Sequence, residues 1–286
     1  MKKIFTFALL IIGYLCYSQT VDHAQLEVMY RYETVSNKLE PEKRTTDEVI
    51  LLIGSKHIGY FSWKNYVADS LRRTNLAEYG TQLMDSDGRL VTIRSGESFD
   101  AAAARGGLSG TTTIIQPRNN PPNNPFNDSR YFINRTSGEV ICMEHVVDLR
   151  ALPSAQAYYI SYTEILKKPV WKISTETANV AGYRSQKATT RYGGRDWIVW
   201  FTHEIPVNEG PWKLRGLPGL ILKAETADGE FSLTATSVSR STNMPIVKDE
   251  KNIYRNVSKR EFIKQKIEGW KNPYRPFEFN HIEILN

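Results

Sequence analysis

The sequence is poor in cysteine, with only Cys16 and Cys142 among its 286 residues. Because Cys16 falls in a leader that we expect to be removed, the mature chain keeps one cysteine and forms no intramolecular disulfide. The five histidines show no i, i+4 spacing, and a single cysteine gives no thiolate metal site. We therefore expect no metal, no cofactor, and a fold held together by packing alone.

Long apolar runs are also lacking, since none approaches the roughly 20 residues that a membrane-spanning helix needs. The longest, residues 4–15, follows a short basic start and precedes small residues. This order predicts a secretory signal peptide over residues 1–18, cut near Ser18/Gln19. We expect an exported protein in the periplasm or at the outer-membrane periphery. The alternatives are acylation of Cys16 or a buried N-terminal helix.

Concentrated charge and catalytic motifs are absent as well. The net charge falls from +6 to +4 when Lys2 and Lys3 leave with the leader, and it is spread along the chain, so we expect no nucleic acid partner. There is no phosphate-binding loop and no dinucleotide fingerprint, and Gly106–Gly110 lacks the glycine spacing of a nucleophile elbow. We assign no catalytic residue, and the sequence favours a protein that is not an enzyme.

Strand patterns dominate what is present. Runs of β-forming residues recur through the chain and are bounded by glycine-containing turns. The predicted fold class is mainly β (α+β), a large curved antiparallel sheet or open half-barrel covered by a few helices. We expect strands near residues 26–35, 48–53, 58–63, 131–135, 138–147, 157–166, 169–177, 183–192, 196–204, 219–226 and 230–239.

Two segments have helical patterns instead. Residues 64–79 are modestly amphipathic. Near the C-terminus, Ser258–Glu261 is a capping box before an apolar helical face that ends at Gly269. We expect these two helices to cover the sheet.

The middle of the chain has the composition of a loop. An alanine run, two glycines and the Asn/Pro-rich residues 116–126 follow one another there. The predicted organisation is a signal peptide at 1–18 and a single β-rich domain at 19–286. A mobile Asn/Pro-rich loop is expected at about 101–128.

The segment after residue 194 is apolar on both faces of its predicted strand, because Trp197 and Trp200 point to opposite sides. Such a strand is covered on both sides or lines an apolar cavity. The loop that follows is either a rigid corner that wedges apolar side chains into the core or the rim of a ligand pocket. If it is a rim, the ligand contacts are Trp197, Trp200, Trp212, Leu217 and Leu220, with Arg195 and Arg215 meeting an anionic head group.

Within this loop, Gly216, Leu217, Pro218, Gly219, Leu220 and Ile221 spell the signature of the GLPGLI family, exported proteins typical of the Bacteroidetes phylum. The wider segment 171–222 is similar to that family as well, although Ser185 stands where many relatives are expected to carry cysteine. The resemblance implies that the chain is a member of this family and is exported, but the family has no settled activity to carry over. More remotely, the same strands resemble periplasmic lipoprotein carriers of the LolA type, which implies an open curved sheet with an apolar concave face.

Three functions follow from these observations. The first is an envelope protein that binds an apolar or amphipathic ligand (lipid, lipid anchor or peptide) in a concave β-sheet cavity. The second is a non-enzymatic scaffold or accessory subunit of an outer-membrane complex, with residues 116–126 contacting an envelope protein partner. The third is an envelope hydrolase with His145 or His203 as its base. We rank them in this order.

Overall fold

The computed structural model describes residues 22–70, 81–84, 90–93, 98–107, 113–115, 129–148, 150, 156–240, 243–248, 253–271 and 276–284. The predicted signal peptide lies outside the described residues, as do residues 116–128 of the predicted loop. Within the described part of the chain, none of the helices has the length and apolar character needed to cross a bilayer.

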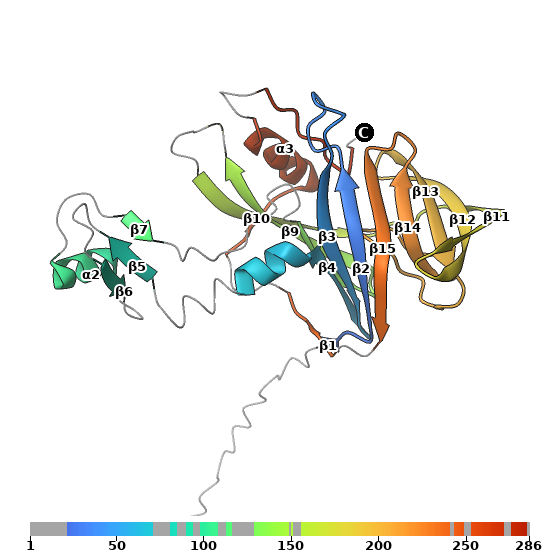
Figure 1. Ribbon diagram of the computed structural model, residues 1–286, viewed down its shortest axis with the longest axis horizontal. Helices are drawn as coiled ribbons and strands as arrows, with labels where there is room; N and C mark the ends of the chain where they lie inside the picture. The colour runs from blue at the N-terminus through green and yellow to red at the C-terminus, as the bar shows by residue number, and fades with distance from the viewer. Residues whose placement is uncertain are drawn as a thin grey trace, which may run out of the picture.

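The main sheet has 12 strands in the order β11-β12-β13-β14-β15-β2-β3-β4-β8-β9-β10-β17 (Figure 1). Its first meander contains β2 (Leu26–Thr34), β3 (Thr45–Ile53), β4 (His57–Ser62), β8 (Arg130–Asn134), β9 (Glu139–Asp148) and β10 (Gln156–Ile165). The second contains β11 (Lys172–Val180), β12 (Tyr183–Tyr192), β13 (Arg195–Thr202), β14 (Leu220–Thr226) and β15 (Phe231–Arg240). Antiparallel pairing of β15 with β2 joins the two meanders, and β17 (Arg255–Asn256) lies parallel to β10.

The predicted fold class is confirmed: the protein is mainly β, with one large sheet that does not close into a barrel and few helices. Each predicted strand is present; the one at 183–192 has the predicted ends, and the others are shifted by a few residues. The strand predicted at 169–177 begins three residues later, at Lys172. The residues before it make other contacts, because the carbonyl of Val170 accepts from Thr190 Oγ1 at 2.7 Å and Trp171 Nε1 donates to the carbonyl of Arg215 at 2.9 Å.

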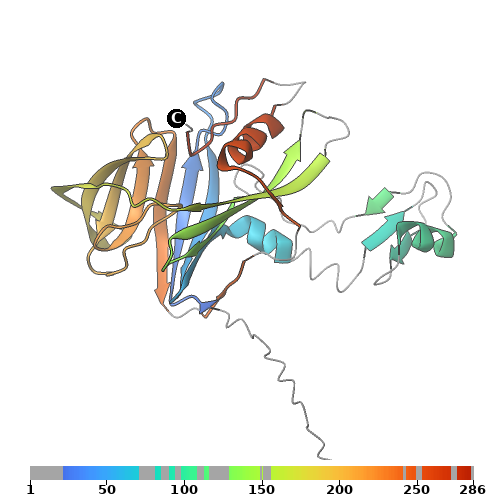
Figure 2. The same cartoon turned by 180° about the vertical axis from the view of Figure 1, so that it is seen from behind.

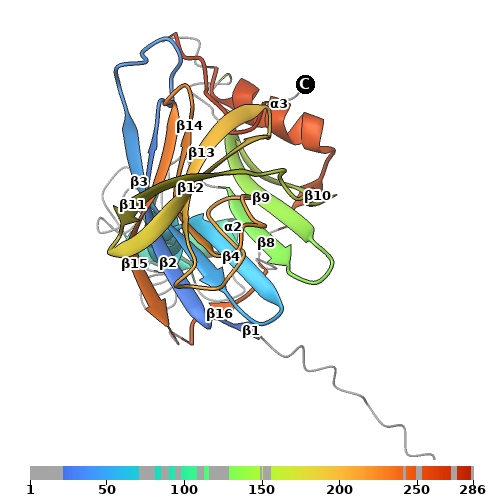
Figure 3. The same cartoon turned by 90° about the vertical axis from the view of Figure 1, so that its right-hand side faces the viewer.

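The sheet is strongly curved (Figure 3). Strands β10 and β11 lie on opposite sides of the sheet order, yet residues 166–171 alone join them. Seven extended residue steps reach at most about 25 Å, so the two sides must approach one another. Helix α3 (Lys259–Gly269) packs on β9 and β10. The N-cap half of the predicted capping box is confirmed, since Ser258 Oγ accepts from the amide of Glu261 at 3.2 Å, whereas Glu261 Oε1 accepts from Gln265 Nε2 at 2.6 Å.

The predicted helix at 64–79 is described only in its first part, where residues 63–70 are helical. The chain then enters a separate small sheet of order β6-β5-β7, built from β5 (Thr81–Met84), β6 (Leu90–Ile93) and β7 (Thr113–Ile115), with α2 (Phe99–Gly106) beside it (Figure 2).

This unit corrects the loop prediction for residues 101–106, which are helical. Alanine has the highest helix propensity, and the hydroxyl of Ser98 accepts from the amide of Ala101 at 3.2 Å, so the alanine run is capped. The glycines at 106 and 107, which suggested a loop, lie at the end of this helix and terminate it.

The inner face of the curved sheet carries the main core, which is rich in aromatic side chains such as Tyr30, Trp197 and Phe231. A smaller cluster lies on the other face of β3, where Ile50 and Leu52 pack with residues of the short strands β1 (Asp22–His23) and β16 (Pro245–Ile246) and their neighbours. Both faces of β3 are therefore covered, as expected for a strand with a continuous apolar run.

Candidate functional site

One end of the curved sheet is crossed by a C-terminal segment. The β2–β3, β12–β13 and β14–β15 connections lie at this end, which we call the mouth; residues 277–284, which we call the strap, run across it (Figure 1). The amides of Asn280 and Ile284 donate to the carbonyls of Ser36 and Gly193 at 3.0 and 2.8 Å. The strap is therefore tied to two different hairpins.

Arg195, the first residue of β13, holds the middle of the strap. Its Nε donates to the carbonyl of Ile282 at 3.1 Å. Its Nη2 donates to the carbonyl of His281 at 2.9 Å and to Asn280 Oδ1 at 2.8 Å. The guanidinium thus donates hydrogen bonds to both the backbone and a side chain of an extended peptide segment.

The rest of the Arg195 guanidinium is neutralised by the sheet itself. Its Nη1 pairs with Asp228 at 3.0 Å and with Glu230 at 2.7 Å, and the group lies 4.5 Å above the ring of Phe231. These partners belong to the β14–β15 hairpin. Two carboxylates of the sheet therefore balance the charge independently of the strap.

Lys213 forms a second buried centre below the strap, with only 1% of its side chain exposed. Its Nζ donates to Tyr162 Oη at 2.7 Å, Glu164 Oε1 at 2.5 Å and Glu283 Oε2 at 2.8 Å. Lys259 pairs with both carboxylates. Burial acts to lower the pKa of Lys259, but its bonds to Glu164 and Glu283 outweigh burial and raise it. The two lysines and two carboxylates form a closed, charge-balanced network.

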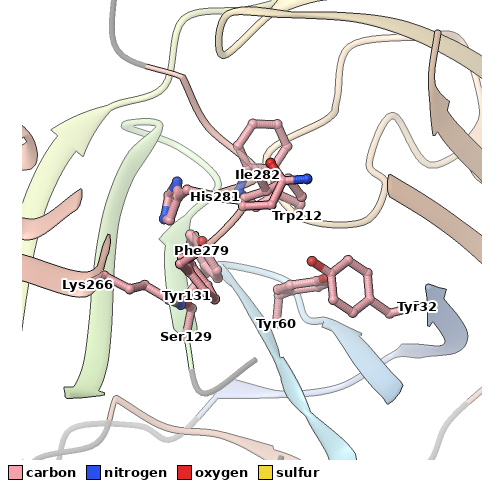
Figure 4. A pocket seen from close by; sticks show the side chains of 10 residues that line it. Tyr32, Tyr60, Ser129, Tyr131, Trp212, Lys266, Phe279, His281 and Ile282 are labelled. Carbon is pink, nitrogen blue, oxygen red and sulfur yellow. The ribbon is translucent and has the colours of Figure 1, made fainter. Parts of the chain in front are cut away.

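A cavity of about 30 Å³ lies under the strap (Figure 4). From α3, the buried Lys266 donates to Ser129 Oγ at 2.8 Å and Glu144 Oε2 at 2.7 Å beside it. Trp212 Nε1 is buried and has no hydrogen-bond partner among the described residues. The cavity suits about one or two water molecules and is too small for an acyl chain. It is lined by Tyr32, Tyr60, Ser129, Tyr131, Trp212, Lys266, Phe279, Asn280, His281 and Ile282.

His281 of the strap is buried and uncharged at neutral pH. Burial lowers its pKa to about 3, and the nearby charge of Lys266 acts in the same direction. Its Nδ1 lies 2.9 Å from the carbonyl oxygen and 3.1 Å from the amide nitrogen of Glu283, and these contacts do not offset the effect of burial. Protonation of this ring therefore opposes the closed strap.

Residues 216–221, which carry the GLPGLI signature and which we call the bracket, lie where β13 ends and β14 begins, at the end of the sheet opposite the mouth. Gly216 has a φ of +95°, which other residues rarely adopt. A Cβ on Gly219 would clash with the carbonyl oxygen of Thr202. The backbone therefore turns where only glycine fits, and this turn follows directly on Trp212 and Lys213, which point into the interior.

The predicted ligand residues do not converge on one open pocket. Trp212 lines the small cavity and packs on Trp197 with ring centroids 5.6 Å apart. Leu217 and Leu220 are core residues, 1% and 0% exposed. Trp200 lies on the outer face of β13, because strand alternation turns it away from the buried positions. The burial of these residues is compatible with the rigid-corner interpretation, and contact of any of them with a ligand stays a prediction.

The two predicted arginines also have partners within the protein. Arg195 binds the strap, and Arg215 pairs with Glu209 at 3.1 Å instead of facing an open site. Burial raises the pKa of Glu209, and its two arginine partners, Arg215 and Arg135, act against that rise. Of the predicted set, Arg195 and Trp212 are the residues that reach the mouth.

Sequence reasoning missed the buried lysines and their carboxylates. The one available signal is Lys213, a charged residue directly after Trp212 inside an otherwise apolar, glycine-bounded loop. Nothing in the sequence connects it with Glu283, which lies 70 residues further on. Likewise, Lys266 and Glu144 are separated by 122 residues.

The candidate catalytic side chains have ordinary surroundings. His145 stacks on Tyr159 with centroids 4.8 Å apart, and the exposed His203 lies 3.2 Å from Gln186 Oε1. Burial raises the pKa of the Cys142 thiol to about 12. Among the residues that the structure describes, no group of three His, Cys, Asp or Glu side chains is arranged to hold a metal ion.

A family model described as "N-glycanase peptide, N-terminal domain" matches residues 110–260. Two solved structures of PNGF-II, in space groups P21 and C2, share 16% sequence identity with the chain, with TM-scores of 0.47 and 0.46. They cover 86% and 85% of this chain, whereas the chain covers 34% and 33% of theirs, so it spans about a third of their length. No curated protein matches the chain. The matched range contains Arg195 and Lys213 and ends before the strap.

Proposed function

The chain belongs to the family of the N-glycanase N-terminal domain, and from that premise we propose that it is an exported protein that binds an amphipathic ligand at the mouth of its curved sheet. Among the three ligand classes suggested by the sequence, a peptide is favoured over a lipid or a lipid anchor. The observation that carries this proposal is the strap, a peptide segment already held at the mouth by Arg195 and Lys213.

The donors at the mouth suit a peptide backbone. Arg195 donates to two successive strap carbonyls, contacts that any extended peptide offers regardless of its sequence. Lys213 and Lys259 select a carboxylate. Aromatic rings of Tyr60 and Trp212 supply apolar surface beneath. The combination is amphipathic, with cationic groups beside aromatic ones.

A lipid fits the geometry less well. An acyl chain needs a continuous apolar tunnel, whereas the cavity below the strap measures about 30 Å³ and is lined partly by Ser129, Lys266 and Asn280. The interior of the sheet is filled by its own aromatic side chains instead. An alkyl chain there would lie against polar groups and would satisfy none of their hydrogen-bonding capacity, which costs free energy relative to water.

Native mass spectrometry of the mature protein, purified from its own envelope, tests the proposal. We expect a stoichiometric bound species that solvent extraction or peptide sequencing identifies as a peptide. The same measurement gives the mature mass, which should correspond to a chain that begins at Gln19 if the signal peptide is removed as proposed. Bound lipid would exclude the peptide version, and a clean apo mass under gentle conditions would count against the mouth as a ligand site.

A matched pair of variants locates the ligand. Lys266→Met removes the cation that lies against the cavity, and Lys264→Met removes an exposed cation from the same helix. We expect the bound fraction to fall in the first variant and to stay at the wild-type level in the second. Circular dichroism and the unfolding temperature of both variants show whether the fold is kept. Equal ligand occupancy in two folded variants would place the ligand elsewhere.

The family description favours glycosylated peptides as a second ligand class, because it names an N-glycanase. A synthetic N-glycopeptide and the same peptide without its glycan form the test pair, both measured by titration calorimetry. Tighter binding of the glycosylated form would support this reading. Equal binding would leave the peptide as the recognised part.

We also propose that the chain is a GLPGLI-type protein. The signature residues 216–221 form the bracket that follows Trp212 and Lys213, so a structural role explains why the motif stands at this position. The bracket then supports the mouth and does not itself contact the ligand.

A further inference from the structure

We propose that the mouth is a docking site for an extended acidic peptide of a partner protein, and that the strap fills this site in cis until the partner displaces it. The ligand chemistry is an aromatic side chain followed four residues later by a carboxylate. This inference rests on the proposed function and adds its substrate class and its regulation.

The strap is bound as a ligand is bound, not as a strand of the sheet. Its one bridge pairs Phe279 with Asn37, which lies in a loop and not in a strand. Backbone bonds to Ser36 and Lys38 form this bridge, and a further backbone bond runs to Gly193; all three residues lie in hairpin connections. Backbone groups of loops and side chains therefore hold the strap, and a segment held in this way opens at lower free energy than a central strand.

Two side chains of the strap carry its specificity. The ring of Phe279 stacks on Trp270 with centroids 5.8 Å apart and planes 12° apart. The carboxylate of Glu283 lies between Lys213 and Lys259. Because Phe279 and Glu283 are four residues apart, a displacing peptide needs an aromatic residue and a carboxylate at the same spacing.

The cations of the mouth keep partners when the strap leaves. Lys213 retains Glu164 and the hydroxyl of Tyr162, and Arg195 retains two carboxylates of the sheet. Opening of the strap therefore leaves neither of these buried cations without a partner. A buried cation without a partner would make displacement too costly. The site is preorganised to accept a second carboxylate.

The strap does not fill the site beneath it completely, so a partner peptide can make additional contacts. The cavity of about 30 Å³ remains beneath it, and the strap supplies four of the ten residues that line this space. The buried Trp212 Nε1 there lacks an acceptor among the described residues. A partner peptide whose side chain fills this space and accepts from the indole would bind more tightly than the strap.

Fluorescence anisotropy with a labelled synthetic peptide of strap sequence, residues 276–286, tests the proposal on the full mature chain. Glu283→Gln in the protein weakens the cis strap, so we expect this variant to bind the peptide about tenfold more tightly than wild type. A peptide with the same Glu283→Gln change should lose about tenfold in affinity. Glu225→Gln, which breaks a lysine–carboxylate pair away from the mouth, is the matched control and should behave as wild type.

Two results would overturn the inference. One is equal or undetectable peptide binding by wild type and Glu283→Gln, which would make the strap a permanent part of the fold. The other is a concentration-dependent dimer of Glu283→Gln that excess peptide dissociates, which would assign the mouth to the strap of a second copy. A ligand that co-purifies at the mouth while the strap stays closed would leave the proposed function standing and remove this inference alone.

Discussion

Replacing Lys213 with methionine probes the buried centre of the mouth. The side chain is 1% exposed, and its Nζ bonds to Glu164, Glu283 and Tyr162 within 2.5–2.8 Å. Methionine keeps most of the length of the side chain but leaves two carboxylates that share only Lys259. Removing one partner of a buried ion pair costs about 3–5 kcal/mol, and because Lys259 remains we expect a loss of about 3 kcal/mol in the free energy of unfolding.

Urea unfolding followed by tryptophan fluorescence measures this loss, with the midpoint and the slope fitted separately. The control is Lys223→Met, which removes a lysine from a part-exposed pair with Glu225 and should cost no more than about 1 kcal/mol. In the double variant Lys213→Met/Glu283→Gln, one stranded carboxylate is removed, so the combined loss should fall short of the sum by about 1 kcal/mol or more. Two results would refute the coupling between Lys213 and Glu283: a free energy of unfolding of Lys213→Met within about 1 kcal/mol of wild type, or losses in the double variant that add strictly.

Three further predictions concern the bracket, the strap and α3. In the bracket, Gly219→Ala should destabilise the protein by about 3 kcal/mol, because its Cβ meets backbone. Gly216→Ala places its Cβ at an ordinary contact distance of 3.9 Å from Trp171 Nε1 and should cost about 1–2 kcal/mol for its positive φ. Equal losses by chemical unfolding would count against this difference. In the strap, the pKa of His281 is about 3 in the folded protein and about 6.5 in the unfolded chain. The unfolded chain therefore takes up a proton first as the pH falls, and the free energy of unfolding should drop by about 2 kcal/mol between pH 6.5 and 5. His281→Asn should lose this part of the acid sensitivity, measured as unfolding free energy against pH, while His203→Gln on the surface keeps it; unchanged pH profiles in both would contradict the prediction. In α3, Ser258→Ala removes the N-cap acceptor and should cost about 1 kcal/mol, and a neutral result would show that the cap adds nothing.

Local patterns were enough to predict most of the fold. The strands of the main sheet follow from runs of β-forming residues between glycine-containing turns, and α3 follows from its capping box. The pairing of β15 with β2, which joins the two meanders, could not be predicted because it connects strands that are about 200 residues apart and has no local signature. The small sheet β5–β7 was missed because its strands are only three or four residues long.

The site was predictable only in part. Arg195 and Trp212 were singled out from the sequence and reach the mouth. Their neighbours there could not be predicted, because Arg195 binds the distant strap and Trp212 shares the cavity with Lys266 of α3. Trp200 was predicted to contact the ligand together with Trp197, although strand alternation places these two side chains on opposite faces of β13. Charges that neutralise one another across long sequence separations, such as Lys213 and Glu283, are recognised only when the chain is folded.

Residue-resolved hydrogen exchange on the full mature chain tests most directly whether the strap is a displaceable ligand of the mouth. The amides of Asn280 and Ile284, which donate to Ser36 and Gly193, should exchange about a hundredfold faster than those of Val199 in β13, because the strap opens without unfolding the sheet. Strap amides that exchange only as fast as β13, through global unfolding, would contradict the account and make residues 277–284 an inseparable part of the fold.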